Sequence, residues 1–200
     1  MRKLLLLLCA VLVLCTACAG KAERFSSPDE VLLKINGSPV LTARDYLFAE
    51  AWQNAEKELF HKAALTEDAL FSELSAAAAC SVFAEEYGTA ADKPELEGEY
   101  EVYIESAGSD EESKQCAQKV KAALSLSDSE LKELYLKNAY FYASTDALVK
   151  DIAGVYTDTS DPESIRERVM DNIREIASYY DIEANFAGTE RELDYAAVTN

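Results

Sequence analysis

The chain has 200 residues, with 37 Asp and Glu against 19 Lys and Arg and a single His, for a formal net charge of −18 at pH 7. Hydrophobic residues make up 49% and aromatic residues 10%, which is typical of a folded domain and not of a disordered chain. This acidic excess argues against binding to nucleic acid or to an anionic membrane surface through charge. One His also excludes zinc sites of the His-Glu-x-x-His type and any chemistry that needs two imidazoles.

The N-terminus has the pattern of a signal peptide. Arg2 and Lys3 precede an apolar run over 4–14, which is too short for a permanent membrane span and suits the core of a signal peptide. The run leads into Cys15-Thr16-Ala17-Cys18, which resembles the lipobox of bacterial lipoproteins, although that family usually has leucine where Cys15 stands. The resemblance implies cleavage after residue 17, a diacylated Cys18 and an extracytoplasmic protein anchored in the lipid bilayer. The alternative is an ordinary secretory signal that contains cysteines.

These features divide the chain into four predicted parts. Residues 1–17 are the signal peptide, 18–29 a polar tether, 30–186 a folded domain and 187–200 a flexible tail. Cleavage would leave 17 Lys and Arg against 37 Asp and Glu, a net charge of −20.

Besides Cys18, the exported chain would keep Cys80 and Cys116. These two cysteines either form a disulfide, which an oxidising compartment allows, or remain as two separate buried thiols. Their spacing indicates neither a redox motif nor a zinc site, and we expect no bound metal.

The first predicted elements are a β-hairpin and two helices. Val31–Ile35 and Val40-Leu41 flank Asn36-Gly37, which is among the strongest short hairpin signals. Thr42, with an acid three residues later, is expected to open a helix through a capping box. A second helix is expected to begin at Thr66 and to end at Gly88.

The segment 94–107 fits two patterns. Residues 95–102 alternate as a strand would, whereas Leu96, Tyr100 and Ile104 share one helical face behind Pro94, and we favour the helix. Acidic residues crowd the sequence from Asp92 to Glu112. They are expected to form a solvated face, in preference to a catalytic carboxylate pair or a calcium site.

Two further helices and a strand complete the predicted fold. Ser127 with Glu130 opens a long aromatic helix that ends at Gly154, and Asp161-Pro162 opens a last amphipathic helix. The alternating segment 181–186 is expected to add a strand to the N-terminal hairpin. The predicted fold class is therefore mainly α, an elongated multi-helix domain with a small N-terminal β-hairpin joined by a short C-terminal strand.

Three segments, in this order, resemble the SurA/PrsA-type extracytoplasmic chaperones: 34–42 leading into a long helix, 84–88, and 127–135. The resemblance covers about residues 30–153, and the last helix and strand resemble the segment that completes the SurA N-terminal domain. It implies ATP-independent binding of unfolded or secreted polypeptides, without a cofactor.

In those relatives a parvulin-type prolyl isomerase domain separates the two helical halves, and its site uses a pair of histidines. Here only residues 154–161 join the two helices, and such a loop cannot hold a domain of ~100 residues. We therefore expect a chaperone module without its isomerase, and no enzyme activity. Two alternatives stay open: isomerase activity, and a scaffold lipoprotein that holds one dedicated partner.

Aromatic side chains on two helices are the candidate contacts to an unfolded client, since the resemblance would bring these helices together. Tyr and Trp side chains can contact peptide segments of varied sequence. The alternative is that some of these aromatic residues belong to the hydrophobic core. His61, near the end of the first helix, is expected to be structural, and no Ser or Cys stands in a recognisable catalytic motif. The candidates are Phe48, Trp52, Tyr135, Tyr140, Phe141 and Tyr142.

Overall fold

The computed structural model describes residues 24–106, 111–156 and 161–199, and it is mainly α-helical with a small sheet, as predicted. The predicted signal peptide and Cys18 lie outside the described residues. The elements, in chain order, are β1 (Val31–Ile35), β2 (Ser38–Thr42), α2 (Ala43–Phe60), α3 (Glu67–Tyr87), α4 (Lys93–Tyr100), the π-helical turn η1 (Glu101–Glu105), α5 (Glu111–Leu124), α6 (Asp128–Gly154), α7 (Pro162–Ala177), β3 (Ile182–Phe186), β4 (Thr189–Arg191) and the 3-10 turn η2 (Tyr195–Val198).

The antiparallel sheet brings the two ends of the described chain together. Its strand order is β2-β1-β3-β4, and Leu33 of β1 lies opposite both Leu41 of β2 and Ala184 of β3. Asn36 and Gly37 make the hairpin turn with φ angles of 50° and 75°, which this pair of residues tolerates. The prediction that segment 181–186 joins the hairpin is thus confirmed.

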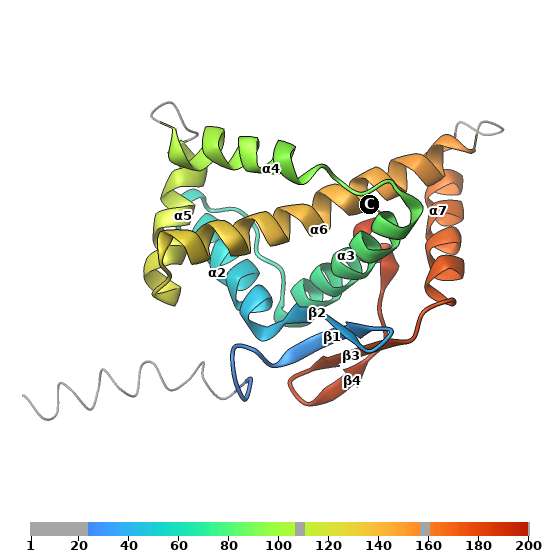
Figure 1. Cartoon of the computed structure of the whole chain (residues 1–200), viewed down its shortest axis with the longest axis horizontal. Helices are drawn as coiled ribbons and strands as arrows, with labels where there is room; N and C mark the ends of the chain where they lie inside the picture. Colours follow the sequence, from blue (N-terminus) through green and yellow to red (C-terminus); the bar gives the residue numbers. More distant parts are fainter. Residues whose placement is uncertain (1–23, 107–110, 157–160, 200) are drawn as a thin grey trace, which may run out of the picture.

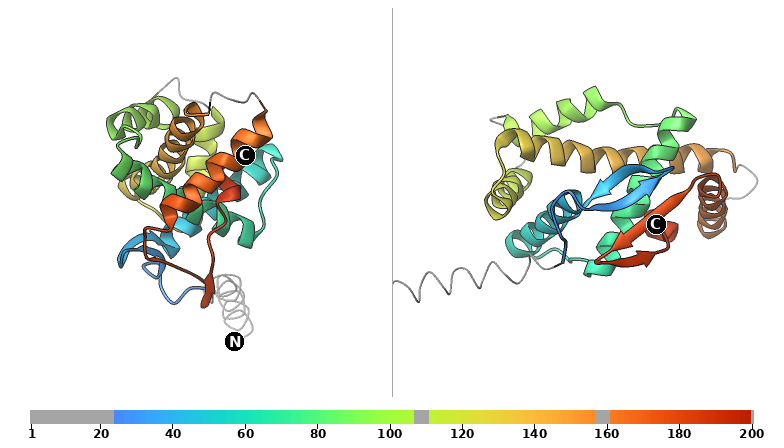
Figure 2. Two further views of the ribbon diagram at one scale, coloured as in Figure 1. Left: turned by 90° about the vertical axis from the view of Figure 1, so that its right-hand side faces the viewer. Right: turned by 60° about the horizontal axis from the view of Figure 1, so that its bottom comes forward.

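Helix α3 lies at the centre of the fold, between α6 and the sheet (Figures 1 and 2). The side chains of Ala76–Ala79 are completely buried, and their small size lets the neighbouring helix approach closely. Thr145 of α6 donates a hydrogen bond from its hydroxyl to the carbonyl oxygen of Ala77, at 3.1 Å. The other elements pack around this helix pair.

Helix α6, 27 residues long, runs along the long dimension of the molecule and serves two hydrophobic cores (Figure 1). Phe141 and Leu148 belong to the larger core, with α3, α7 and the sheet. Leu131 and Leu134 belong to a smaller core with α2, η1 and α5.

The predicted helix starts and stops are confirmed where they fall on described residues. Thr42 with Asp45, and Ser127 with Glu130, each make a reciprocal capping box, and Gly88 ends α3 with a φ of 73°. The ambiguous segment 94–107 is helical up to residue 105, as α4 and η1. The helix prevails because its stripe of apolar side chains is buried: Leu96, Tyr100 and Ile104.

The fold begins before residue 30 and continues past residue 186, so two predicted boundaries are wrong. Phe25, from the expected tether, packs against Tyr46 and Phe186 with ring centroids 5.6 and 5.8 Å apart. In the expected tail, β4 pairs with β3, and the buried ring of Tyr195 lies 6.4 Å from that of Phe83. Burial of these rings stabilises both segments on the domain.

The two cysteines of the folded domain are separate buried thiols, which was one of the two alternatives. Cys80 lies in the larger core and Cys116 in the smaller one. Burial raises the pKa of the Cys80 thiol to about 12, so it stays protonated and unreactive at neutral pH.

Two tyrosine–glutamate hydrogen bonds attach other helices to the C-terminal part of α3. Tyr140 of α6 donates to Glu85 at 2.6 Å, and Tyr180, just after α7, donates to Glu86. Burial, and then the neighbouring carboxylate, raise the pKa of each phenol to about 12.

We predict that Ala77→Leu destabilises the protein by about 1–3 kcal/mol, because a larger side chain overpacks the interface between α3 and α6. Urea unfolding followed by circular dichroism measures the loss. Ala122→Leu, at an exposed position of α5, is the matched control and should change the free energy of unfolding little. Equal stability of the two variants would contradict the close packing described here.

We also predict a loss of stability in alkali. Each of these phenols has a pKa near 10 in the unfolded chain and about 12 in the folded protein. Its contribution to the free energy of unfolding is therefore complete below pH 10 and is lost as the pH rises toward 12. The free energy of unfolding should therefore fall over this range. The Tyr140→Phe/Tyr180→Phe double variant should show a shallower fall, and an unchanged slope would rule out these two phenols as its source.

Candidate functional site

An open hollow of about 490 Å³ lies between α2, the start of α3 and the N-terminal half of α6, with the 61–66 loop on one side. Its walls are largely apolar and aromatic, and polar side chains stand among them. A volume of this size suits several side chains of a bound ligand. We call it the aromatic hollow. Its lining residues are Phe48, Ala49, Trp52, Gln53, Glu56, Ala63, Leu65, Leu70, Glu73, Ser113, Tyr135, Asn138, Ala139 and Tyr142.

A continuous row of rings crosses the hollow and the core behind it. Trp52 of α2 lies between Phe48 and Tyr135, with ring centroids at 5.9 and 5.3 Å, and Tyr100 follows 5.1 Å beyond Tyr135. Phe48 and Tyr100 are buried, whereas Trp52 and Tyr135 are partly exposed. The rings of α2 and α6 therefore meet, as the resemblance implies, and two of them reach the surface.

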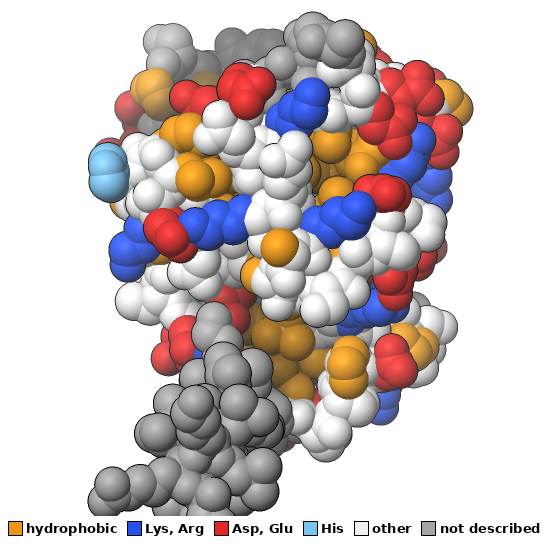
Figure 3. Space-filling view, turned by 90° about the vertical axis from the view of Figure 1, so that its left-hand side faces the viewer, with side chains coloured by type: hydrophobic (Ala, Val, Ile, Leu, Met, Phe, Trp, Pro, Cys, Tyr) orange, Lys and Arg blue, Asp and Glu red, His pale blue; other side chains and the backbone are white. Residues whose placement is uncertain are grey.

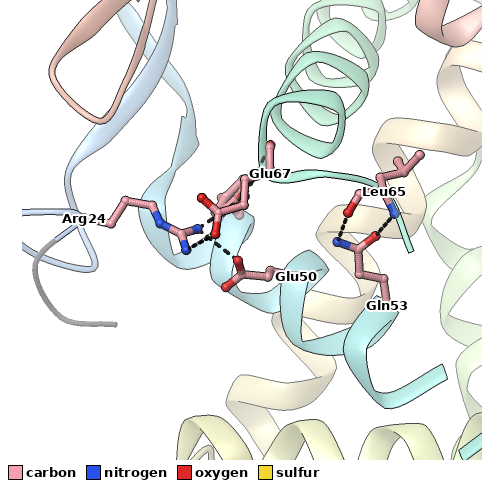
Figure 4. A network of polar contacts seen from close by, with 6 residues as sticks. Arg24, Glu50, Gln53, Leu65 and Glu67 are labelled. Atoms are coloured by element: carbon pink, nitrogen blue, oxygen red, sulfur yellow. Dashed lines mark hydrogen bonds and ion pairs between the residues drawn. The ribbon is translucent and has the colours of Figure 1, made fainter. Parts of the chain in front are cut away.

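The loop wall of the hollow is fixed by one side chain of α2. The Gln53 carboxamide accepts a hydrogen bond from the Leu65 backbone N–H at 3.0 Å and donates one to its carbonyl at 3.5 Å (Figure 4). Because both backbone groups of Leu65 are held, its side chain, 44% exposed, stays at the edge of the hollow.

One turn earlier on α2, an ion-pair network anchors the first described residues (Figure 4). The Arg24 guanidinium lies 2.9 Å from the carboxylate of Glu50 and 2.6 Å from that of Glu67, at the start of α3. Glu50 is almost buried, so this pair is shielded from solvent more than a surface ion pair. The network joins α2 to α3 beside the hollow.

Ion pairs also join α2 to α6 on the other side. Lys137 contacts the buried Asp45 at 2.6 Å, and Arg44 contacts Glu130 at the same distance. Lys119 of α5 reaches Glu58 of α2 at 2.5 Å. Basic and acidic side chains accordingly alternate across this end of the molecule, with apolar side chains visible between them (Figure 3). Ion pairs and hydrogen bonds thus join the walls of the hollow to one another without a ligand.

The hollow presents neutral rings beside negative charge. The Tyr142 hydroxyl donates to Glu73 at 3.1 Å, and burial together with this carboxylate raises the pKa of Tyr142. Burial likewise raises the pKa of Tyr135. Both phenols stay protonated near neutral pH, and the carboxylates of Glu56 and Glu73 stand beside them.

Two of the six aromatic candidates do not line the hollow. Phe141 is 4% exposed in the larger core, so the core alternative holds for it. Tyr140 lies on another side of α6, beneath the Lys93 ammonium at 4.7 Å, where it lines a separate hollow of about 230 Å³. Adjacent residues on a helix point about 100° apart, and this separates Tyr140 and Phe141 from Tyr142.

The remaining polar candidates from the sequence do not line the aromatic hollow. His61 is exposed and ends α2 with a φ of 57°. Over 24–106, 111–156 and 161–199, no three His, Cys, Asp or Glu side chains gather as metal ligands. The described acidic residues from Asp92 onward are mostly exposed, as expected of a solvated face.

Sequence reasoning identified four of the lining residues and missed the others, among them Gln53, Leu65 and Leu70. No periodic signal marks Gln53 or Leu65, because their contact depends on how the 61–66 loop folds back. The sequence pattern predicts Tyr100 on the apolar face of a helix, as observed. The pattern does not indicate that this ring packs against Tyr135 of the hollow.

Comparisons with protein-family models, with curated proteins and with solved structures found no match for this chain. Within the described residues, no helix is long and apolar enough to cross a lipid bilayer. The resemblance to the SurA/PrsA-type chaperones therefore stays a prediction from the sequence.

Proposed function

We propose that the protein is a membrane-tethered, ATP-independent holdase that binds unfolded or exported polypeptides in the aromatic hollow. The observation that carries this proposal is the partly exposed surface of Trp52, Tyr135 and Tyr142 beside Leu65, in a hollow whose walls are already fixed. The sequence resemblance to extracytoplasmic chaperones supports the same function.

The chemistry of the hollow suits clients of varied sequence. Aromatic rings bury much area with few rotatable bonds, so they bind apolar side chains without demanding one shape. Fixed walls reduce the entropy lost on binding. The carboxylates among the rings, such as those of Glu56 and Glu73, can accept hydrogen bonds from a client's backbone N–H groups.

The net charge suits a protein that must keep its complexes in solution. At −20 after the predicted cleavage, complexes of the protein with a client repel one another, which opposes their aggregation. The binding proposed here is weak and reversible, so a client can be released without nucleotide hydrolysis. The lipid on Cys18 would hold this activity at the membrane where exported chains emerge.

We predict that the Leu65→Glu variant suppresses aggregation less well than the wild-type protein. About ten times more of the variant per client molecule should be required for the same suppression. The substitution removes an apolar contact at the edge of the hollow and adds a charge beside Glu56, a cost of about 1–2 kcal/mol. The measurement is light scattering of a chemically unfolded client diluted into rising amounts of the protein, without ATP.

The matched control is Val102→Glu, which makes the same change at an exposed apolar residue away from the hollow. Circular dichroism verifies that both variants are folded. Equal effects of the two substitutions would remove the hollow from the proposal. If the folded wild-type protein fails to suppress aggregation at near-stoichiometric amounts, the holdase function is wrong, and a pull-down with one stoichiometric partner would identify a scaffold instead.

A further inference from the structure

The C-terminal ends of α3, α6 and α7 meet at the opposite end of the molecule (Figure 1; Figure 2, left), and a second recessed surface lies there. It consists of two hollows of about 290 and 330 Å³ that share Tyr87 and Tyr179 as lining residues. We call the two together the end cleft. It shares no lining residue with the aromatic hollow.

Tyr87 and Tyr179 are unusually exposed for aromatic residues, at 55% and 74%. Within the described residues, neither side chain makes a hydrogen bond or a ring contact with the rest of the protein. Their faces are thus available to a ligand. The π-electrons of a tyrosine ring attract a cation placed over it.

Negative charge dominates the end cleft. Glu86, Asp151 and Glu175 line it, and no Lys or Arg is among its described lining residues. The Arg168 guanidinium of α7 lies over Tyr156 at 5.3 Å from the ring centroid. The surface therefore lacks the cations that would neutralise its carboxylates.

The helix ends add to this negative potential. Tyr87 is the last residue of α3, and Val155 and Tyr179 lie just past the ends of α6 and α7. The carbonyl groups at a helix C-terminus favour a nearby cation, which proteins usually supply as Lys or Arg in the last turn. Neither α3 nor α6 has a basic residue there, and Arg174 of α7 pairs with Asp171.

An apolar strip continues from the tyrosines along the larger hollow. Ile152, Val155 and Ile176 line it, and Val155 is 75% exposed. A lone small cation would leave this strip uncovered. A polypeptide segment would cover it with its own apolar side chains while a basic side chain lies between the tyrosine rings.

We propose that the end cleft binds a partner polypeptide through a segment in which a lysine or arginine is flanked by apolar residues. The basic side chain lies against Tyr87 and Tyr179 beside Glu86 and Glu175, and its apolar neighbours cover the strip on α6 and α7. This inference does not rest on the proposed holdase function, since the two surfaces share no residue.

Three synthetic peptides test the chemistry. The first is Gly-Ser-Leu-Leu-Lys-Leu-Leu-Ser-Gly with a fluorescent label, the second carries acetyl-lysine at its centre, and the third has serine in place of every leucine. Fluorescence anisotropy with the purified protein should show binding of the first peptide, weakened about tenfold or more in the other two. Equal binding of the acetylated peptide would overturn the role of the cation. Equal binding of the serine peptide would show attraction to net charge alone and would also overturn the proposal.

Two pairs of variants locate the binding. The Tyr87→Ala/Tyr179→Ala double variant should weaken binding of the first peptide about tenfold, whereas Tyr103→Ala, an exposed tyrosine elsewhere, should not. Glu175→Gln should weaken binding more than Glu167→Gln, an exposed neighbour on α7 outside the cleft.

All four variants change exposed side chains, so the fold should survive, and circular dichroism verifies it. The same loss in each variant and its control would refute the end cleft as the site, as would failure of the wild-type protein to bind the first peptide. Leu65→Glu should leave this binding unchanged, which separates the present proposal from the holdase function.

Discussion

The close approach of α3 and α6 is the constraint on which the rest of the structure depends. The small side chains of Ala76–Ala79 leave room for α6, and the Thr145 hydroxyl lies within hydrogen-bond distance of the carbonyl oxygens of Ala77 on α3 and Phe141 on α6. With bulkier residues the helix axes would move apart, and the sheet on the other side of α3 would lose its support. Because α6 serves both hydrophobic cores, its position relative to α3 also sets the position of α2.

The same helix separates the two recessed surfaces. The part of α6 up to residue 142 contributes Tyr135 and Tyr142 to the aromatic hollow, and the last turn contributes Asp151 and Ile152 to the end cleft. A continuous helix of 27 residues is about 40 Å long. The two surfaces are therefore held apart at a fixed spacing by one rigid element, and they differ in chemistry. Ion pairs join the helices around the first surface, and its Glu56 pairs with Lys62, whereas no ion pair among the described residues involves the carboxylates of the second.

Local chemistry made much of the fold predictable. Thr42 and Ser127 signal helix starts through short-range hydrogen bonds, and Asn36-Gly37 signals a turn through its own backbone preferences, so neither depends on distant parts of the chain. The misjudged segments depend on distant partners. Phe25 is ordered by Tyr46 and Phe186, and the three residues of β4 are too few to show an alternating pattern.

The candidate site was also predictable only where its features depend on local sequence. Phe48 and Trp52 are four residues apart, a spacing that places both on one face of a helix, and their rings lie 5.9 Å apart. The family resemblance implied that the helix of Tyr135 lies opposite, and Trp52 and Tyr135 do meet. Which of three successive aromatic residues on α6 faces α2 depends on the rotation of that helix, which is set by packing in both cores. The Gln53–Leu65 contact closes a loop whose path no periodicity encodes. The exposed Tyr87 and Tyr179 come from different helices, and only the folded structure brings them together.

The position of β1 in the sheet has a consequence for how the protein is made. One edge of β1 pairs with β2, which follows it closely in the sequence. The other edge pairs with β3, where Lys34 contacts Glu183, 149 residues later in the chain. A ribosome delivers the chain from its N-terminus, so the hairpin exists for most of synthesis with one edge of β1 unpaired. Open edges of this kind pair readily with other chains. A chain that stops before residue 184 keeps that edge exposed, and a truncated product is therefore a greater aggregation hazard than the complete protein.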